Sequence, residues 1–334
     1  MVAGGAYGSE TGGRTGCAAG FKRRMAFLKE FGAYLPSRLV GNEEMGVLAG
    51  AAPDWILNVS GMLERRFAAT EEGVADLATA AAKTCLDRCG LDASALGMVM
   101  VASGTAERRF PGPATTVSRR LGLSAPPAID LPIPSAGSLF ALALASRLAG
   151  EYGNILVIAA EKMSAVSLKP PIAAGTAVLF GDGAGACVLS ATAGMAEIVD
   201  SVMYSDGTFS EDLRLGFDAP LEMNGRSIIM QASRKIPRAI AELLKRQRVA
   251  AADVETFVMH QANQNLIDAV ARALGVPSSR FYSNIRRYGN TSSASMLIAA
   301  AEWSQETGFH SGRPVVFAGF GAGLHWGALL ARGV

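Results

Sequence analysis

The chain has 334 residues, 50% of them apolar and 18% charged, and its 31 basic and 29 acidic side chains give a net charge of +2. So many apolar and so few charged residues exclude an intrinsically disordered chain, and the balanced charge offers no basic surface for nucleic acid. No apolar run reaches the length of a membrane span, so the composition predicts a globular protein with a large core, interface or ligand tunnel.

The cysteines and histidines predict neither disulfides nor a metal site. Four cysteines do not make a disulfide framework in a chain of this length. Cys85 and Cys89 share one face of an expected helix, where buried packing is favoured over metal binding. None of the three histidines has zinc-ligand spacing to another histidine or a cysteine. We therefore expect a metal-free protein of the cytoplasm.

Along the chain, short apolar runs alternate with longer helical patterns. Residues 1–24 are rich in glycine and threonine and carry no secretory signal, so we expect a disordered leader there, with the folded unit beginning near Met25. Strands are expected at 98–102, 155–160, 177–180 leading into 186–189, 256–259 and 314–318, and helices at 78–89, 115–121, 138–148, 265–274 and 292–305. This alternation predicts an α/β fold whose strands are covered on both faces.

Two glycine-rich runs indicate an internal duplication. FGDGAG at 180–185 and FGAG at 320–323 each lead into an expected strand, about 140 residues apart. We expect two halves, residues 25–192 and 193–334, although the abundance of glycine leaves coincidence open. Neither run has the strand-to-helix context of a dinucleotide site.

Three polar positions carry the candidate chemistry. Ser135 follows two prolines and begins a buried helix, which favours either a nucleophile at a helix N-terminus or a simple N-cap. His260 ends an apolar strand and is either functional or a satisfied core residue; Asn290 precedes a small-residue helix and is either functional or a cap. Together they supply a nucleophile, a base and a polar stabiliser.

Several motifs in unbroken order resemble β-ketoacyl-ACP synthase III of the thiolase superfamily. They are FGDGAGA at 180–186, HQAN at 260–263, GNTS at 289–292 and GFGAGLHWG at 319–327. The resemblance runs from about Met25 to the C-terminus. It implies a five-layered α-β-α-β-α fold of two duplicated halves, a homodimer, no permanently bound cofactor, and acyl-CoA and acyl carrier protein as substrate and partner.

The resemblance also implies catalytic roles. Members of the family use a Cys nucleophile in a segment ending Cys-Ala-Gly, and the matching residues here are Ser135, Ala136 and Gly137. His260 and Asn290 match the other two catalytic residues. The backbone N–H groups of Ser135 and Ala322 are implied to bind the oxyanion.

Further positions match substrate contacts of the family. Trp55 is implied to stack on the CoA adenine, and Phe110 to reach across the dimer into the acyl pocket of the partner. The other implied substrate contacts are Leu179, Phe180, Met223 and Asn263. Val59 and Asn265 stand where the family has arginines, which predicts weaker or rearranged binding of CoA phosphates and of an acidic carrier protein.

The predicted reaction depends on the presence of serine, in place of cysteine, at position 135. A serine hydroxyl needs a base, for which His260 is the candidate, and its acyl ester is less activated toward a carbanion than a thioester. We predict an acyltransferase of the synthase III type that loads Ser135 and passes the acyl group to malonyl-ACP or another acceptor, in fatty-acid, polyketide or specialised lipid biosynthesis. A non-catalytic partner subunit and a serine thioester hydrolase remain as alternatives.

Overall fold

A computed structural model describes residues 25–216 and 219–334; the expected leader, residues 1–24, lies outside the described residues. Ten strands form one sheet in the order β12-β11-β13-β14-β8-β1-β7-β6-β4-β5. Those of the first half are β1 (Phe27–Tyr34), β4 (Leu96–Ala102), β5 (Ala128–Leu131), β6 (Asn154–Lys162) and β7 (Asp182–Ser190). Those of the second half are β8 (Ala196–Ser205), β11 (Thr256–Met259), β12 (Phe281–Tyr282), β13 (Pro314–Gly321) and β14 (His325–Gly333).

The two halves of the sheet repeat one topology. The order β5-β4-β6-β7-β1 matches β12-β11-β13-β14-β8, and matching neighbours are parallel or antiparallel in the same way. The halves join where β1 pairs with β8 at only two positions, Phe27 with Glu197 and Leu28 with Ala196. The duplication suggested by the two glycine-rich runs is therefore present in the topology.

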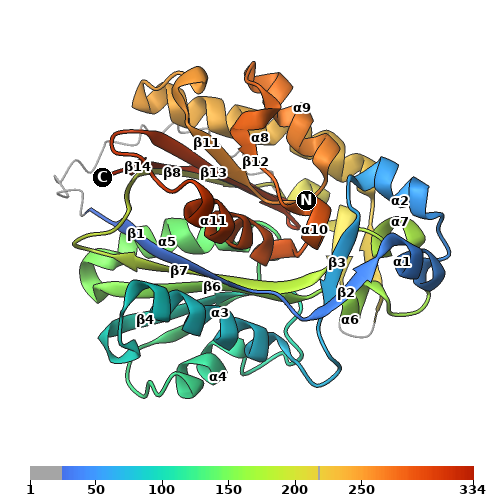
Figure 1. The fold of residues 1–334 in the computed structure, drawn as a ribbon, viewed down its shortest axis with the longest axis horizontal. Helices are drawn as coiled ribbons and strands as arrows, with labels where there is room; N and C mark the ends of the chain where they lie inside the picture. Colours follow the sequence, from blue (N-terminus) through green and yellow to red (C-terminus); the bar gives the residue numbers. More distant parts are fainter. Residues whose placement is uncertain (1–24, 217–218) are drawn as a thin grey trace, which may run out of the picture.

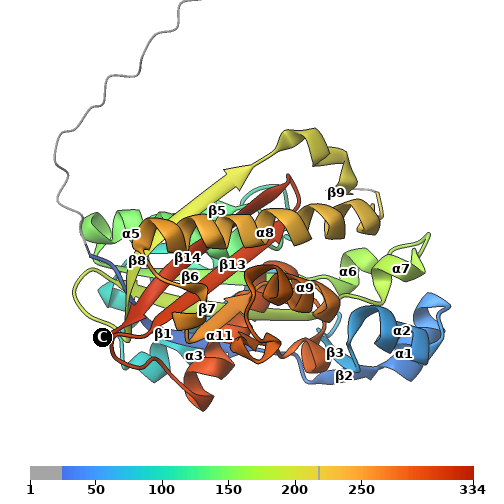
Figure 2. The same cartoon turned by 90° about the horizontal axis from the view of Figure 1, so that it is seen from above.

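Helices complete five layers (Figure 1). One outer face carries α3 (Val74–Cys89) and α4 (Pro113–Arg120), and the other carries α8 (Gly225–Gln247) and α9 (Gln264–Leu274). Between the halves of the sheet lie α5 (Gly137–Tyr152) and α11 (Ser295–Glu306). Figure 2 shows the long helix α8 lying across β14 and β13. The predicted α-β-α-β-α order is thus observed.

The central helices are buried because they are apolar almost all round. Half of the residues of α5 and α11 are alanine, leucine, methionine or isoleucine, and they form one core with the inner faces of both halves of the sheet. Separate apolar clusters lie under α3 and α4 and under α8 and α9. Each outer helix needs only one apolar face, as a helix between sheet and solvent requires.

Smaller elements gather at one end of the molecule (Figures 1 and 2). They are β2 (Arg38–Gly41), α1 (Asn42–Ala49), α2 (Pro53–Ser60), β3 (Glu64–Phe67), α6 (Ser164–Ser167), α7 (Ala174–Ala177), β9 (Leu213–Leu215), β10 (Leu221–Met223) and α10 (Ile285–Tyr288). A strand was expected at 177–180, but α7 ends at Ala177 and β7 begins only at Asp182. No described helix is long and apolar enough to cross a membrane.

Glycine permits the close packing of α11 on β7. A Cβ at Gly185 would lie 2.5 Å from Cβ of Leu297 and 2.8 Å from the backbone N of Ile298. We expect Gly185→Ala to lower the free energy of unfolding by about 1–3 kcal/mol through overpacking, measured by urea denaturation. Gly207→Ala, which has no neighbour within 4 Å, is the control; an equal loss in both variants would contradict this interpretation.

Candidate active site

Ser135 lies in a strained turn before central helix α5. Its φ is 59°, in the left-handed region that serine seldom occupies, and such residues concentrate at functional sites. The helix is capped by Ala136 with no side-chain hydrogen bond, so Ser135 is not an N-cap. Gly321, at the end of β13, packs against the turn: a Cβ there would lie 2.3 Å from the Pro134 carbonyl oxygen. The hydroxyl is therefore held near the helix N-terminus without serving as its cap.

A second serine, Ser292, faces the first from the turn before α11. Its φ is 49°. The Ser135 backbone N–H donates to Oγ of Ser292 at 3.0 Å, and the two hydroxyl oxygens lie 3.4 Å apart. Ser292 Oγ in turn donates to Oε1 of Glu161 at 3.0 Å. The turns that begin the two central helices are thus joined by hydrogen bonds across 157 residues of sequence.

His260 follows β11 directly and is buried. Burial lowers its pKa to about 4, opposed by a hydrogen bond with the Ser292 backbone, so the ring is neutral at physiological pH. Its Nδ1 lies 2.6 Å from Oγ of Ser295 on α11, which also accepts the backbone N–H of Gln261. Nδ1 of His260 is therefore engaged by Ser295.

The side-chain amide of Asn290 is oriented by the backbone of Ser292. Its Oδ1 accepts the backbone N–H of Ser292 at 2.8 Å, which fixes the orientation of the amide and leaves the NH2 group as a donor. The residue is buried, and its backbone bridges Phe180 at the end of the α7 segment. Asn290 therefore stabilises the turn, as a cap would, and also offers a donor to a ligand.

An apolar cavity of about 210 Å³ brings the three candidate residues together. Ser135, His260 and Asn290 all line it. Five predicted substrate contacts line it as well, namely Trp55, Leu179, Phe180, Met223 and Asn263. Asn263 has little left for a ligand, because Nδ2 donates to the Val59 carbonyl and Oδ1 accepts the Asn265 N–H.

Phe110 is the predicted substrate contact that lies apart. It is 85% exposed in the loop before α4 and lines neither cavity that touches Ser135. Its role across a dimer stays a prediction.

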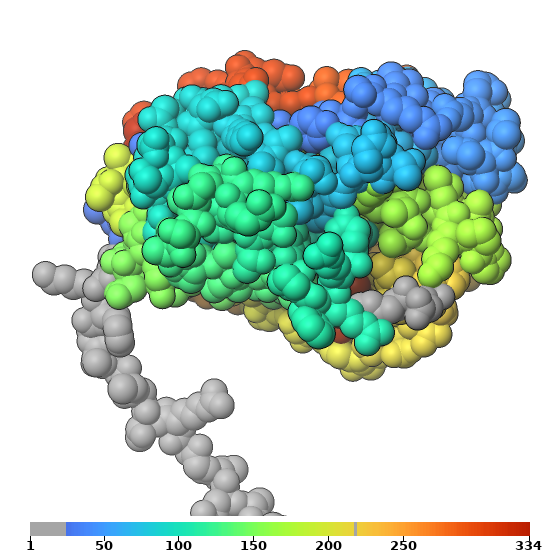
Figure 3. Space-filling view, turned by 90° about the horizontal axis from the view of Figure 1, so that it is seen from below, coloured from blue at the N-terminus to red at the C-terminus, as the bar shows by residue number. Residues whose placement is uncertain are grey.

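A smaller cavity, about 50 Å³, lies on another side of Ser135 and is lined by Ala322. Figure 3 shows a recess between the segment around residue 110 and the α6–α7 segment, where C-terminal residues are visible. The lining includes Thr105, Met163, Leu213 and Leu221.

Of the two backbone N–H groups predicted to bind an oxyanion, that of Ser135 already donates to Ser292. That N–H serves an oxyanion only if it is shared with, or released from, Ser292.

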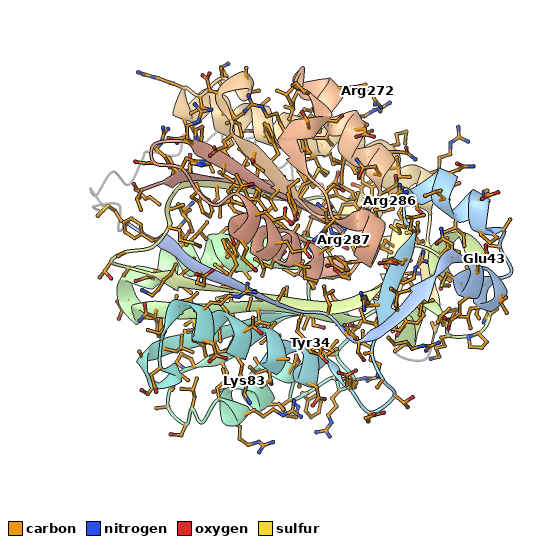
Figure 4. The ribbon with its side chains drawn as sticks, in the orientation of Figure 1. Tyr34, Glu43, Lys83, Arg272, Arg286 and Arg287 are labelled. Atoms are coloured by element: carbon orange, nitrogen blue, oxygen red, sulfur yellow. The ribbon has the colours of Figure 1, made fainter. Side chains whose placement is uncertain are left out.

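Among the described residues, no lysine or arginine lines the larger cavity. Val59 and Asn265, the positions where arginines are absent, lie against each other, with Asn265 Nδ2 3.4 Å from the Val59 carbonyl. Figure 4 shows Arg286 and Arg287 on neighbouring α10. Arg287 pairs with Glu302 at 2.9 Å, so Arg286 is the more available of the two for a phosphate.

Sequence reasoning missed Glu161, Ser292 and Ser295. Ser292 contacts Ser135, His260, Asn290 and Glu161 through its side chain or backbone. One signal was available: PSAGSL at 134–139 and TSSASM at 291–296 place serines at matching positions of the two halves. Nothing local in the sequence marks Glu161.

The described residues contain no group of three or more metal-ligating side chains. A five-layered α-β-α-β-α arrangement of two similar halves, with a polar site at the start of a central helix, defines the thiolase-like fold. Solved structures agree: 3-oxoacyl-[acyl-carrier-protein] synthase III from Aquifex aeolicus VF5 superposes with a TM-score of 0.87 at 33% identity, covering 92% of this chain and 99% of that one. The priming β-ketosynthase from the R1128 polyketide biosynthetic pathway superposes with a TM-score of 0.86 at 28% identity, covering 93% and 97%.

Sequence comparison gives the family. Residues 129–207 match 3-oxoacyl-[acyl-carrier-protein (ACP)] synthase III, and residues 244–332 match the C-terminal part of the same family. Beta-ketoacyl-[acyl-carrier-protein] synthase III of Clostridium perfringens strain SM101 is 35% identical over 319 residues, covering 90% of this chain and 97% of that protein. The chain belongs to the 3-oxoacyl-[acyl-carrier-protein] synthase III family.

Burial of His260 makes the fold sensitive to acid. Its pKa falls from 6.5 to about 4 on folding, so the unfolded chain binds the proton first and stability is lost as the pH falls through that interval. We expect this residue to remove about 2 kcal/mol of stability between pH 7 and pH 5. Denaturation of wild type and His260→Gln at both values tests this; equal pH dependence in the two proteins would contradict it.

Proposed function

We propose that the protein is an acyltransferase that forms an ester on Ser135. The acyl donor is a thioester of CoA or of an acyl carrier protein, and the acceptor is malonyl-ACP or another nucleophile. The proposal is carried by one observation: the hydroxyl of Ser135, whose backbone is left-handed, a neutral histidine and an oriented amide line one apolar cavity. Such groups suit acyl transfer.

The surroundings of Ser135 favour attack on a thioester. The N-terminus of the 16-residue helix α5 stabilises negative charge that develops beside it. Ala322 is positioned next to Ser135 at the small cavity, where its N–H is the remaining candidate for the oxyanion. The side chains of His260 and Asn290 bind the thioester carbonyl of an incoming acceptor. These groups need no bound cofactor.

The ester bond limits the second half-reaction. An oxygen ester is less reactive toward a carbanion than the thioester that a cysteine would form, so we propose transfer to a hydroxyl, amine or thiol as the favoured outcome. Because residues 59 and 265 are valine and asparagine and not arginines, we propose that the donor is held by contacts other than paired phosphate–arginine bonds.

Assembly follows the family resemblance. We propose a cytoplasmic homodimer of two-part subunits, residues 25–192 and 193–334, in which exposed Phe110 is covered by the partner. An exposed aromatic ring of this size is typical of an interface.

We expect wild-type protein to gain the mass of one acyl group when incubated with short acyl-CoAs or acylated carrier proteins, and Ser135→Ala to gain none. Intact-mass analysis followed by peptide mapping locates the ester. Absence of an adduct across the donor panel would contradict the proposal and favour a non-catalytic partner subunit. Rapid release of free acid that depends on Ser135 would instead identify a hydrolase.

The cavity beside Ser135 predicts a short acyl group. At about 50 Å³ it holds on the order of a few heavy atoms. Leu213 lines both this cavity and the larger one, so Leu213→Ala is expected to join them and raise acylation by longer chains relative to short ones. Competition between acyl-CoAs of different length measures the shift. Leu48→Ala, on α1 outside both cavities, is the control; an unchanged preference in Leu213→Ala would refute the assignment.

A further inference from the structure

We propose that Glu161 and Ser292 form a proton relay for Ser135, with Glu161 as a positioning residue that acts through the Ser292 hydroxyl. This inference rests on the proposed function, since it concerns how the Ser135 hydroxyl is activated. It assigns the proton to a carboxylate that no sequence motif indicates. It also differs from the sequence-based expectation that His260 is the base.

The direction of the hydrogen bonds defines the relay. A carboxylate accepts only, so the single proton of Ser292 Oγ points to Glu161 Oε1, 3.0 Å away. Ser292 Oγ therefore presents lone pairs to Ser135, where it accepts the backbone N–H at 3.0 Å. The Ser135 hydroxyl, 3.4 Å from the same oxygen, has an acceptor in that direction. This distance is long, but bonds between a nucleophile and its base commonly shorten on substrate binding.

Glu161 is placed to take up a proton from Ser292. It is fully buried at the end of β6, and each carboxylate oxygen accepts three neutral donors. The donors are the hydroxyls of Ser103, Thr105, Ser292 and Ser293 and the backbone N–H groups of Gly104 and Ser293. Burial raises the pKa of Glu161, although the hydroxyl donors lower it in part.

The charged side chains nearest to Glu161 in the sequence and on the adjacent strand bind other groups. Lys162 donates its amine to the backbone carbonyls of Ala69, Thr70 and Glu72, and Asp182 on β7 accepts from Ala68 and Ser164. His260 reaches the network only through Ser292 and is neutral. No described cation forms an ion pair with Glu161. The protonation of Glu161 is therefore not suppressed by an adjacent positive charge.

In the proposed acylation, one proton moves from Ser135 to Glu161. Ser135 Oγ forms a bond to the thioester carbonyl carbon, its proton moves to Ser292 Oγ, and the Ser292 proton moves to Glu161. The C–S bond then breaks, and the thiolate leaves and takes a proton from water. When the acceptor attacks the ester, the bond to Ser135 breaks and Glu161 returns its proton by the reverse path, while the acceptor proton goes to solvent.

The relay predicts a specific pH dependence of acylation. Protonation of Glu161 blocks the path, so the rate should fall on acidification, starting above the pH range of an ordinary carboxyl group because burial raises its pKa. Titration of His260, whose pKa is about 4, would act at lower pH. A fall in acylation rate caused by protonation of Glu161 can therefore be distinguished by its pH range from one caused by protonation of His260.

The test compares single-turnover acylation of wild type, Glu161→Gln and Ser292→Ala over a pH series. We expect each variant to be slower by about 100-fold and to lose the acidic decline. Asp182→Asn is the matched control: it also removes a buried carboxylate with neutral donors, but should retain the decline. Circular dichroism confirms folding, and Ser292→Ala serves if Glu161→Gln does not fold.

A second comparison separates proton transfer from mere support of the turn. Ser135→Cys supplies a nucleophile that attacks as a thiolate and needs the relay less. We expect Glu161→Gln to cost much less in the Ser135→Cys background than in wild type, which a double-mutant cycle measures. Equal losses in both backgrounds, or unchanged rate and pH dependence in Glu161→Gln, would overturn the relay alone. Absence of any adduct in wild type would overturn the proposed function and with it the relay.

Discussion

The hydrogen bond from the Ser135 backbone to Ser292 connects the two central helices where both begin, and the rest of the site is arranged around it. Both serines have left-handed backbone angles, a conformation that costs about 1–3 kcal/mol each and survives only when its surroundings fix it. Glu161 holds the Ser292 side chain in place by accepting its hydrogen bond. By accepting from the segment after β4 and from the turn before α11, it ties the two halves of the fold together at one buried point.

Duplication explains why this junction exists. In a fold built from two similar halves, the turns before α5 and α11 occupy equivalent places and meet between the two halves of the sheet. One turn presents the candidate nucleophile, and its counterpart bonds to that nucleophile and orients Asn290. The two turns share a serine with a left-handed φ, and they differ in the side chains that surround it.

Much of this could be predicted from sequence, because apolar runs and ordered motifs mark strands, central helices and the residues that end them. Ser135, His260 and Asn290 come together as predicted, while the reaction assigned to them stays a prediction. Helix α8 was missed because Pro237 interrupts its pattern, although the helix continues through it. Glu161 was missed because a lone glutamate at a strand end has no local signature: its importance arises from six donors contributed by two distant segments. Long-range convergence of this kind is visible only in three dimensions.

The left-handed angle of Ser135 also limits which nucleophiles the position accepts. A threonine has the same hydroxyl chemistry, yet its branched Cβ is poorly tolerated at positive φ, and Gly321 leaves little space beside the turn. Cysteine and serine are both unbranched and nearly equal in size. The backbone at position 135 therefore accepts cysteine or serine but not threonine. Evolution can exchange a thiol and a primary alcohol at this position without changing the fold.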